Sequence, residues 1–348
     1  MRFFTALLST FALANSVSAH PGANVQAELL ERKAFLANAK RPDLSHCAAQ
    51  IKARGLEQRG IERRNAIAQE KSKRGLIKRD PADVNKTHLS NASYGPQTPL
   101  DVVFGTNASC VLSPEVIEGP YYVAGESIRK NIVEKEPGIP LFVDLAIYDT
   151  TTCEPIPDIW VEIWACNSTG VYSGVASGAD YSDAPENLNT SFLRGFQQSD
   201  KDGALQFEAI FPGHYSGRTQ HIHIMVHPNA TARENLTISD TTASHVGQIY
   251  FDQDLIDAVE KFEPYNTNTQ PITVNSEDTL LASGLETSDP IMQYVMLGDS
   301  VEDGILSWLS FGIDPDYATT VYAAATRYKE GGVANDEPAP IPSDLTAS

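Results

Sequence analysis

The chain has 348 residues, with 26 Lys and Arg against 45 Asp and Glu and a formal net charge of −19 at pH 7. Residues 80–348 hold most of the acidity, with 39 acidic against 11 basic side chains. Such an acidic body repels nucleic acid and anionic membranes, so we expect neither as a partner. The composition instead favours a small substrate and an acidic extracellular medium.

Residues 1–19 have the layout of a secretory signal peptide. Arg2 supplies a positive charge, residues 3–13 form an apolar stretch, and residues 17–19 form a cleavage site of small side chains. The apolar stretch is shorter than the about 20 residues that a membrane-spanning helix needs, and no later stretch reaches that length. We therefore predict a secreted, extracellular, soluble protein.

Sequons and cysteines agree with export. Seven N-x-S/T sequons predict a glycoprotein, and they lie at Asn85, Asn91, Asn107, Asn167, Asn189, Asn229 and Asn235. Four cysteines without CxxC spacing predict one or two disulfides in an oxidising compartment, namely Cys47, Cys110, Cys153 and Cys166. The sequence leaves open which cysteines pair and which sequons carry glycans.

Residues 20–79 differ from the rest of the chain in being basic, with 14 Lys and Arg against 6 Asp and Glu. Their apolar residues recur at helical spacing, which predicts one or two helices. The segment ends in dibasic pairs at 73–74 and 78–79, so it is either a permanent solvated helix or a pro-segment that a protease removes. Residues 80–106 are rich in Asn, Ser, Pro and Gly and predict a linker.

Short β-rich runs follow at 140–150, 158–167, 204–212 and 221–227. They alternate apolar with polar residues and are separated by turn residues, a pattern typical of an antiparallel sandwich. We predict a mainly β protein, in which residues 107–330 form an antiparallel β-sandwich catalytic core. The N-terminal helical segment and peripheral loops surround this core, and residues 331–348 are predicted to be a disordered acidic tail.

The run at 221–227 reads HIHIMVH and raises the possibility of a metal site. Side chains at i and i+2 of a strand share one face, about 6–7 Å apart, so His221 and His223 project together. Two such histidines alone are more often surface residues than ligands. Tyr172 and Tyr215 strengthen the case for a metal, because each follows a strand through a glycine-containing turn.

Three motifs together resemble the intradiol ring-cleavage dioxygenase family. These are EGPYY at 118–122, VEIWACNSTGVY at 161–172 and PGHYSGRTQHIH at 212–223, which stand in the family's order. The resemblance spans about residues 110–310 and implies one non-haem Fe(III) ion per chain. The implied ligands are Tyr172, Tyr215, His221 and His223. Phenolate is a hard anionic donor that suits a hard, highly charged ion.

The resemblance also implies roles and a reaction. Tyr215 would leave the iron when substrate binds, and Arg218 would face the substrate ring and stabilise developing negative charge. Tyr121, Tyr122 and Gln220 are the implied substrate-binding residues. The implied substrates are a small aromatic diol and O₂, whose reaction opens the ring between the two hydroxyl-bearing carbons to a cis,cis-muconate, with no organic cofactor. We expect His214 and His227 not to be ligands and Arg129 to be structural.

Several alternatives stay open at this point. The family's intracellular members dimerise through a helical N-terminal region that residues 20–79 do not resemble, so the oligomeric state is open and includes a homodimer. Cleavage after Ala19 would expose His20, the residue type that secreted copper monooxygenases use, although a Pro-Gly and a helical pattern follow it. A secreted β-sandwich binding module, with a purely structural HIH strand and no iron, is a non-enzymatic alternative. The residues do not identify the natural catechol.

Overall fold

The computed structural model describes residues 44–72, 84–85, 93–94, 99–104, 109–111, 121–176, 185–240, 242–285 and 289–340. The predicted signal peptide, His20 and both dibasic pairs lie outside these residues. Within them, no helix is both long and apolar enough to cross a membrane.

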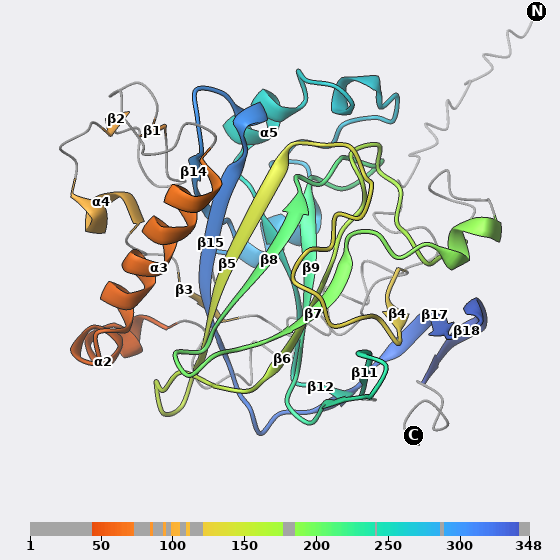
Figure 1. Cartoon of the computed structure of the whole chain (residues 1–348), viewed down its shortest axis with the longest axis horizontal. Coiled ribbons are helices and arrows are strands. Elements are labelled where there is room, and N and C mark those ends of the chain that lie inside the picture. The colour runs from red at the N-terminus through yellow and green to blue at the C-terminus, as the bar shows by residue number, and fades with distance from the viewer. Residues whose placement is uncertain are drawn as a thin grey trace, which may run out of the picture.

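Two β-sheets packed face to face form the centre of the molecule (Figure 1). The first sheet has four antiparallel strands in the order β13-β9-β6-β7. Its strands are β6 (Trp160–Trp164), β7 (Arg194–Gln198), β9 (His221–His227) and β13 (His245–Tyr250).

The second sheet has five strands, in the order β14-β15-β5-β8 with β3 also paired to β15. Its strands are β3 (Ser109–Val111), β5 (Pro140–Asp149), β8 (Ala204–Ile210), β14 (Gln293–Met296) and β15 (Ile305–Ile313). β15 runs parallel to both β3 and β5, so this sheet is mixed, while its other pairs are antiparallel. The predicted mainly β sandwich is confirmed, and each of the four β-rich runs contains one strand.

Alternation along the strands produces the core between the sheets. Val143 and Leu145 of β5 face Ile222 and Ile224 of β9 across one continuous apolar cluster. Each such buried side chain contributes about 1.5–3 kcal/mol through removal of apolar surface from water. The same alternation turns His221 and His223 to the other face of the four-stranded sheet.

The N-terminal helices cover the outer face of the five-stranded sheet (Figure 1). The segment consists of a 3₁₀ turn η1 (Ser45–Cys47), α2 (Ala48–Ala53) and α3 (Leu56–Lys71). The two α-helices are separated at Gly55, whose φ of +67° suits glycine. α3 packs Ile61 and Ala68 against Trp308 of β15. One or two helices were predicted here, and the described part of 20–79 has two α-helices.

The structure pairs Cys47 of this helical segment with Cys153 of the loop after β5. Their Cα atoms lie 5.2 Å apart, within the normal range for a disulfide. Cys166 is a buried free thiol, and the side chain of Cys110 lies outside the described residues. One of the pairings that the sequence left open is therefore assigned.

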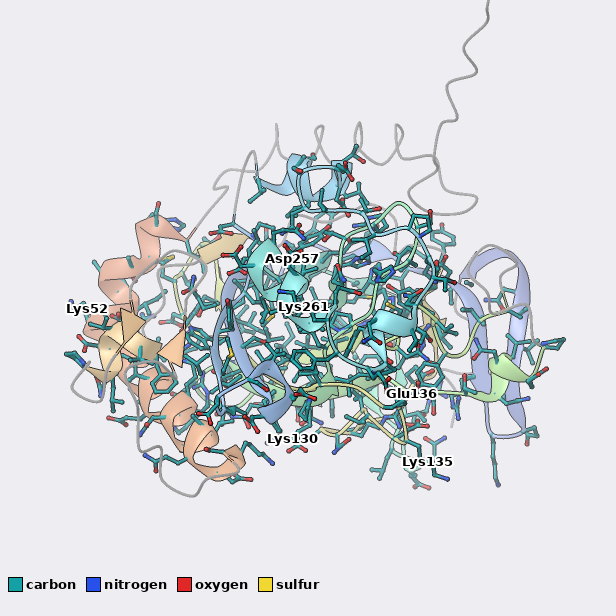
Figure 2. All side chains as sticks on the ribbon, turned by 90° about the horizontal axis from the view of Figure 1, so that it is seen from above. Lys52, Lys130, Lys135, Glu136, Asp257 and Lys261 are labelled. Carbon is teal, nitrogen blue, oxygen red and sulfur yellow. A yellow bond between two sulfur atoms is a disulfide. The ribbon has the colours of Figure 1, made fainter. Side chains whose placement is uncertain are left out.

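A small third sheet covers the outer face of the four-stranded sheet, on the side opposite the helices (Figures 1 and 2). It has the order β18-β17-β4 and consists of β4 (Val123–Ala124), β17 (Tyr322–Tyr328) and β18 (Gly331–Pro340). The predicted disordered tail is thus wrong for 331–340, because β17 supplies backbone partners for this polar stretch. Residues 341–348 lie outside the described residues.

Short elements complete the described chain. The helical ones are α4 (Leu100–Phe104), α5 (Gln253–Val259), α6 (Thr279–Leu285), η2 (Pro185–Asn189), η3 (Tyr265–Thr267) and η4 (Val301–Asp303). The strands are β1 (Val84–Asn85), β2 (Ser93–Tyr94), β10 (Thr231–Ala232), β11 (Ile238–Ser239), β12 (Thr242–Ala243) and β16 (Thr319–Thr320). The predicted linker needs correction at α4, because Phe104 is buried against Trp308.

Candidate metal centre

β9 presents His221 and His223 on the face that the small sheet covers. Their Nε2 atoms lie 3.2 Å apart, and both side chains are buried. His221 Nδ1 donates a hydrogen bond to the Thr219 carbonyl at 2.6 Å. This bond leaves the Nε2 lone pair of His221 directed towards His223, as in a histidine prepared to bind a metal.

Tyr172 and Tyr215 bring their phenol oxygens to the same point. The Tyr172 oxygen lies 3.4 Å and the Tyr215 oxygen 3.2 Å from His221 Nε2. The two rings meet edge to face, with centroids 5.7 Å apart. All four side chains are only 1% exposed. The structure therefore brings together the four residues proposed from the sequence as ligands.

Two glycines allow the tyrosine-bearing turns to approach each other. Gly170 has a φ of +83°, and a Cβ there would lie 2.3 Å from the His214 carbonyl oxygen. A Cβ at Gly213 would lie 2.5 Å from the Ser168 carbonyl oxygen. These close contacts lock the turn before Tyr172 to the turn before Tyr215, so the phenols are held by backbone packing.

The side chain of Asn167 organises the turn before Tyr172. Its Oδ1 accepts hydrogen bonds from the backbone N–H groups of Thr169 and Val171, at 3.1 and 3.0 Å. Its Nδ2 donates to Glu136, which Figure 2 labels, at 2.8 Å. The amide of this sequon is thus engaged within the fold.

The donor set fits a cation of high charge. Metal–nitrogen and metal–oxygen bonds of about 2.0–2.2 Å place neighbouring ligand atoms roughly 3–3.5 Å apart, which matches the observed spacing. Burial raises the pKa of Tyr172 and of Tyr215 well above the usual value, although the charge of Arg218 acts in the opposite direction. Only a strongly positive ion in contact with them offsets that cost for phenolates. Burial also lowers the pKa of His221, which favours the neutral ligand form.

Arg218 lies fully buried beside the four donors. Its Nε donates to Asp278 Oδ2 at 2.9 Å, and its Nη2 donates to the Tyr250 hydroxyl at 3.0 Å and to Gln248 Oε1. Gln248 stands opposite His223 on the neighbouring strand β13. The guanidinium is therefore fixed next to the proposed ligands, where it can stabilise negative charge on a bound molecule.

Tyr121 and Tyr122 occupy different layers. The Tyr121 ring stacks on Tyr172 with centroids 4.4 Å apart, and its buried hydroxyl has no hydrogen-bond partner in the described part of the chain. Tyr122 instead packs on Trp164, whose indole stacks on the His223 ring at 4.8 Å. Tyr121 thus borders the donors, whereas Tyr122 lies one ring behind them, and the substrate-binding roles of both stay predictions.

Gln220 is directed away from the donors. Its Nε2 donates to Glu260 Oε1, the same oxygen that His214 Nδ1 contacts at 2.8 Å. The placement of Gln220 among the substrate-binding residues therefore needs correction, since strand alternation sends it opposite to His221. His214 also contacts the Gln270 carbonyl, and His227 lies between Glu162 and Asp240. Both histidines have partners elsewhere, and their non-ligand roles stay predictions.

Sequence reasoning missed Gln248, Tyr250 and Asp278. Gln248 and Tyr250 lie at i and i+2 of HVGQIY, an alternating strand pattern that could have placed them on one face. Asp278 precedes α6 by one residue, where acidic side chains commonly cap helices. Its pairing with Arg218, 60 residues away, has no signal in the local sequence.

Comparisons with known proteins match the region that contains this centre. The family model described as "Dioxygenase" matches residues 117–279, which include every residue of the donor cluster and the Arg218 network. The chain is 32% identical over 108 residues to a catechol 1,2-dioxygenase of Pseudomonas sp. (strain EST1001) and 30% identical over 145 residues to catechol 1,2-dioxygenase 1 of Acinetobacter lwoffii. These matches cover 30% and 38% of this chain. The chain spans only 32% and 43% of those relatives' lengths.

A solved structure gives the fuller match. An intradiol ring-cleavage dioxygenase from Tetranychus urticae is 35% identical, with a TM-score of 0.48. The match covers 60% of this chain and 97% of that one. On the strength of this identity over nearly the whole length of the relative, the chain belongs to the intradiol ring-cleavage dioxygenase family.

Proposed function

We propose that this protein is a secreted non-haem Fe(III) dioxygenase that cleaves catechol-type rings with O₂ between the two hydroxyl-bearing carbons. The products would be of the cis,cis-muconate type. The observation that carries the proposal is the convergence of the two phenol oxygens and His223 Nε2 within 3.4 Å of His221 Nε2, beside a buried arginine. Family membership supports the reaction class.

Each residue of the proposed site would have a distinct role. Tyr172, Tyr215, His221 and His223 would hold one ferric ion, which would bind both oxygens of the diol and draw electron density from its ring. Tyr215 would accept a proton at its phenol oxygen as the diol binds. Arg218 would hold the negatively charged ring in place and stabilise charge that develops on it. The buried hydroxyl of Tyr121 has no hydrogen-bond partner in the described part of the chain and would donate a hydrogen bond to the bound ring.

Enclosure favours a dry reaction site. The donors lie between the four-stranded sheet and the small sheet, within a buried cluster of aromatic and apolar side chains. Low local polarity strengthens the attraction between Arg218 and a bound anion. Water would be excluded by the same packing that holds the tyrosines.

A visible spectrum of purified protein, before and after anaerobic addition of catechol, tests the proposal directly. We expect one iron per chain, a tyrosinate charge-transfer band, and a shift of this band when catechol binds. Air should then give stoichiometric O₂ uptake and a ring-opened dicarboxylate. Protein without iron that still binds a carbohydrate or a protein would favour the binding module, and a bound copper ion would favour the His20 alternative.

Secretion is the second part of the proposal. The Cys47–Cys153 disulfide supports it, since disulfides persist mainly in oxidising compartments. Expression of the full-length chain in a eukaryotic host should place the protein in the medium, with an N-terminus at or after His20. Retention inside the cell with an intact Met1 would contradict this part alone.

A further inference from the structure

Arg194 is a buried cation on β7 that the proposed chemistry does not use. It stands opposite Trp164 of β6, the residue that stacks on His223. Its side chain is 0% exposed. A buried guanidinium is costly unless partners surround it, so its contacts indicate what it stabilises.

Among the described residues, the hydrogen bonds of the Arg194 side chain all go to Ser173, the residue after Tyr172. Arg194 Nε and Nη2 donate to the Ser173 carbonyl at 3.0 and 2.7 Å, and Nε also lies 3.1 Å from Ser173 Oγ. Ser173 Oγ itself donates to the Phe192 carbonyl at 2.6 Å. The peptide that follows Tyr172 is therefore held by the planar fork of one guanidinium.

A second side chain holds the same turn. Asn187 Nδ2 donates to the carbonyls of Tyr172 and Val175, at 2.7 and 2.6 Å. Residues 171–176 lie outside any strand or helix, so these side chains replace the backbone partners that a sheet would supply. Tyr172 thus depends on Asn187 and Arg194 for a fixed direction.

The charge of Arg194 also acts on two buried carboxyl groups. Glu126 and Glu162 are both 0% exposed, and their oxygens have no hydrogen-bond partner in the described part of the chain. The positive charge of Arg194 acts on both carboxyls across the space between the sheets.

We propose that Arg194 is a positioning residue, whose guanidinium fixes the Ser173 peptide and thereby directs the Tyr172 phenol towards His221. This inference rests on the proposed function, in which Tyr172 binds the ferric ion. Lysine cannot replace arginine in this role, because a single ammonium lacks the planar pair of donors that the carbonyl and hydroxyl receive.

The test compares Arg194→Lys with Arg129→Lys. Arg129 is a matched control, since it also donates to backbone carbonyls, those of Arg194 and Ser191, and among the described residues none of its hydrogen bonds goes to the Tyr172 turn. We expect Arg194→Lys to bind iron with a displaced and weaker tyrosinate band and to lose about 10- to 100-fold in kcat, with KM much less affected. Arg129→Lys should keep the wild-type band and kcat.

The outcomes separate this inference from the proposed function. Wild-type protein without a tyrosinate band would overturn the proposed function and this inference with it. Wild-type activity combined with an unchanged band and kcat in Arg194→Lys would overturn only this inference, even if the variant melts at a lower temperature. If Arg194→Lys fails to fold, Asn187→Ala replaces it as the test, because Asn187 holds the carbonyls of Tyr172 and Val175 in the same turn. A displaced tyrosinate band in Asn187→Ala would support the positioning of Tyr172 by this turn, and an unchanged band would contradict it.

Discussion

Asp278 shows how a single carboxylate can serve two structures at once. Its Oδ2 accepts from Arg218 Nε and from the Thr219 backbone N–H, at 2.9 and 3.0 Å. Its Oδ1 accepts from the first N–H groups of α6, at Leu280 and Leu281. The ion pair with Arg218 is fully buried on both sides. Asp278 therefore fixes the proposed charge-stabilising arginine and begins a helix.

Asp278→Asn should lower the free energy of unfolding by about 3–5 kcal/mol, because it leaves the Arg218 cation buried without its carboxylate. Urea denaturation measures this change, and steady-state kinetics should show a parallel fall in kcat. Asp257→Asn on the exposed face of α5 is the matched control (Figure 2), with an expected change within about 0.5 kcal/mol. A loss at Asp278 no larger than that of the control would contradict the role of this ion pair.

At the scale of elements, the N-terminal helices are held to the sandwich by several kinds of contact. Arg54, Arg59, Arg63 and Lys71 each pair with an acidic residue of the body. The exposed pair of Arg54 contributes little, whereas Arg63 forms a two-pronged contact with the buried Asp144. The basic character of this segment is thus used within the molecule, and the Cys47–Cys153 disulfide adds a covalent link.

The disulfide should dominate the stability of this attachment. It joins residues 106 positions apart, so its removal in a Cys47→Ser/Cys153→Ser variant should cost about 2–5 kcal/mol of unfolding free energy. Arg54→Gln, which removes one exposed ion pair, should cost less than about 1 kcal/mol. Guanidinium denaturation of the wild type and the two variants measures their free energies of unfolding. Equal values would show that the disulfide does not stabilise this attachment.

The same link bears on the predicted pro-segment. A protease cut at 73–74 or 78–79 would leave residues 44–72 attached through Cys47, so the helices should stay with the mature protein. Electrophoresis of secreted protein should then show one band without reductant and, where the chain has been cut, a released N-terminal fragment with reductant. Loss of this fragment from non-reduced protein would mean that the helices are removed after all.

Across the whole molecule, the sequence predicted what local pattern controls. Alternation placed His221 and His223 on one face and the strands β5, β6, β8 and β9 in their correct positions. Alternation could place Gln248 on a strand face but could not show that Gln248 and Asp278 meet at Arg218, because these contacts join distant segments. Adjacency along the chain was a poor guide to contact. Gln220 directly precedes the proposed ligand His221 within the motif but faces Glu260, and the polar stretch at 331–340 becomes a strand only because β17 lies beside it.

The whole molecule also carries a pH dependence with two separable origins. The net charge of −19 at pH 7 becomes more negative as pH rises, and the resulting repulsion weakens the folded state but is screened by salt. The second origin is His227, buried between Glu162 and Asp240 at 3.6 Å from each and next to the Phe196 ring. Burial alone would lower the pKa of His227, but these two carboxylates outweigh it and raise the pKa to about 9.

The sign follows from the two states. The pKa of a histidine in the unfolded chain is about 6.5. The stabilisation from charged His227 is therefore complete below that pH and is lost as pH rises through about 9. Burial raises the pKa of Glu162 to about 7, and the stability linked to its neutral form is likewise lost as pH rises. Both groups therefore make the protein less stable in alkaline solution, in the same direction as the net charge.

His227→Gln distinguishes the two origins. Between about pH 6 and about pH 9.5, the wild type should lose about 3 kcal/mol of unfolding free energy more than the variant, from the shift of about 2.5 pKa units at His227. Urea denaturation at low salt and at about 0.5 M NaCl measures both contributions. Salt should flatten the part that the two proteins share, and the difference between them should persist, because the His227 pair is buried beyond effective screening. Parallel curves for the two proteins at both salt concentrations would contradict the assignment to His227 and leave net charge and Glu162 as the causes.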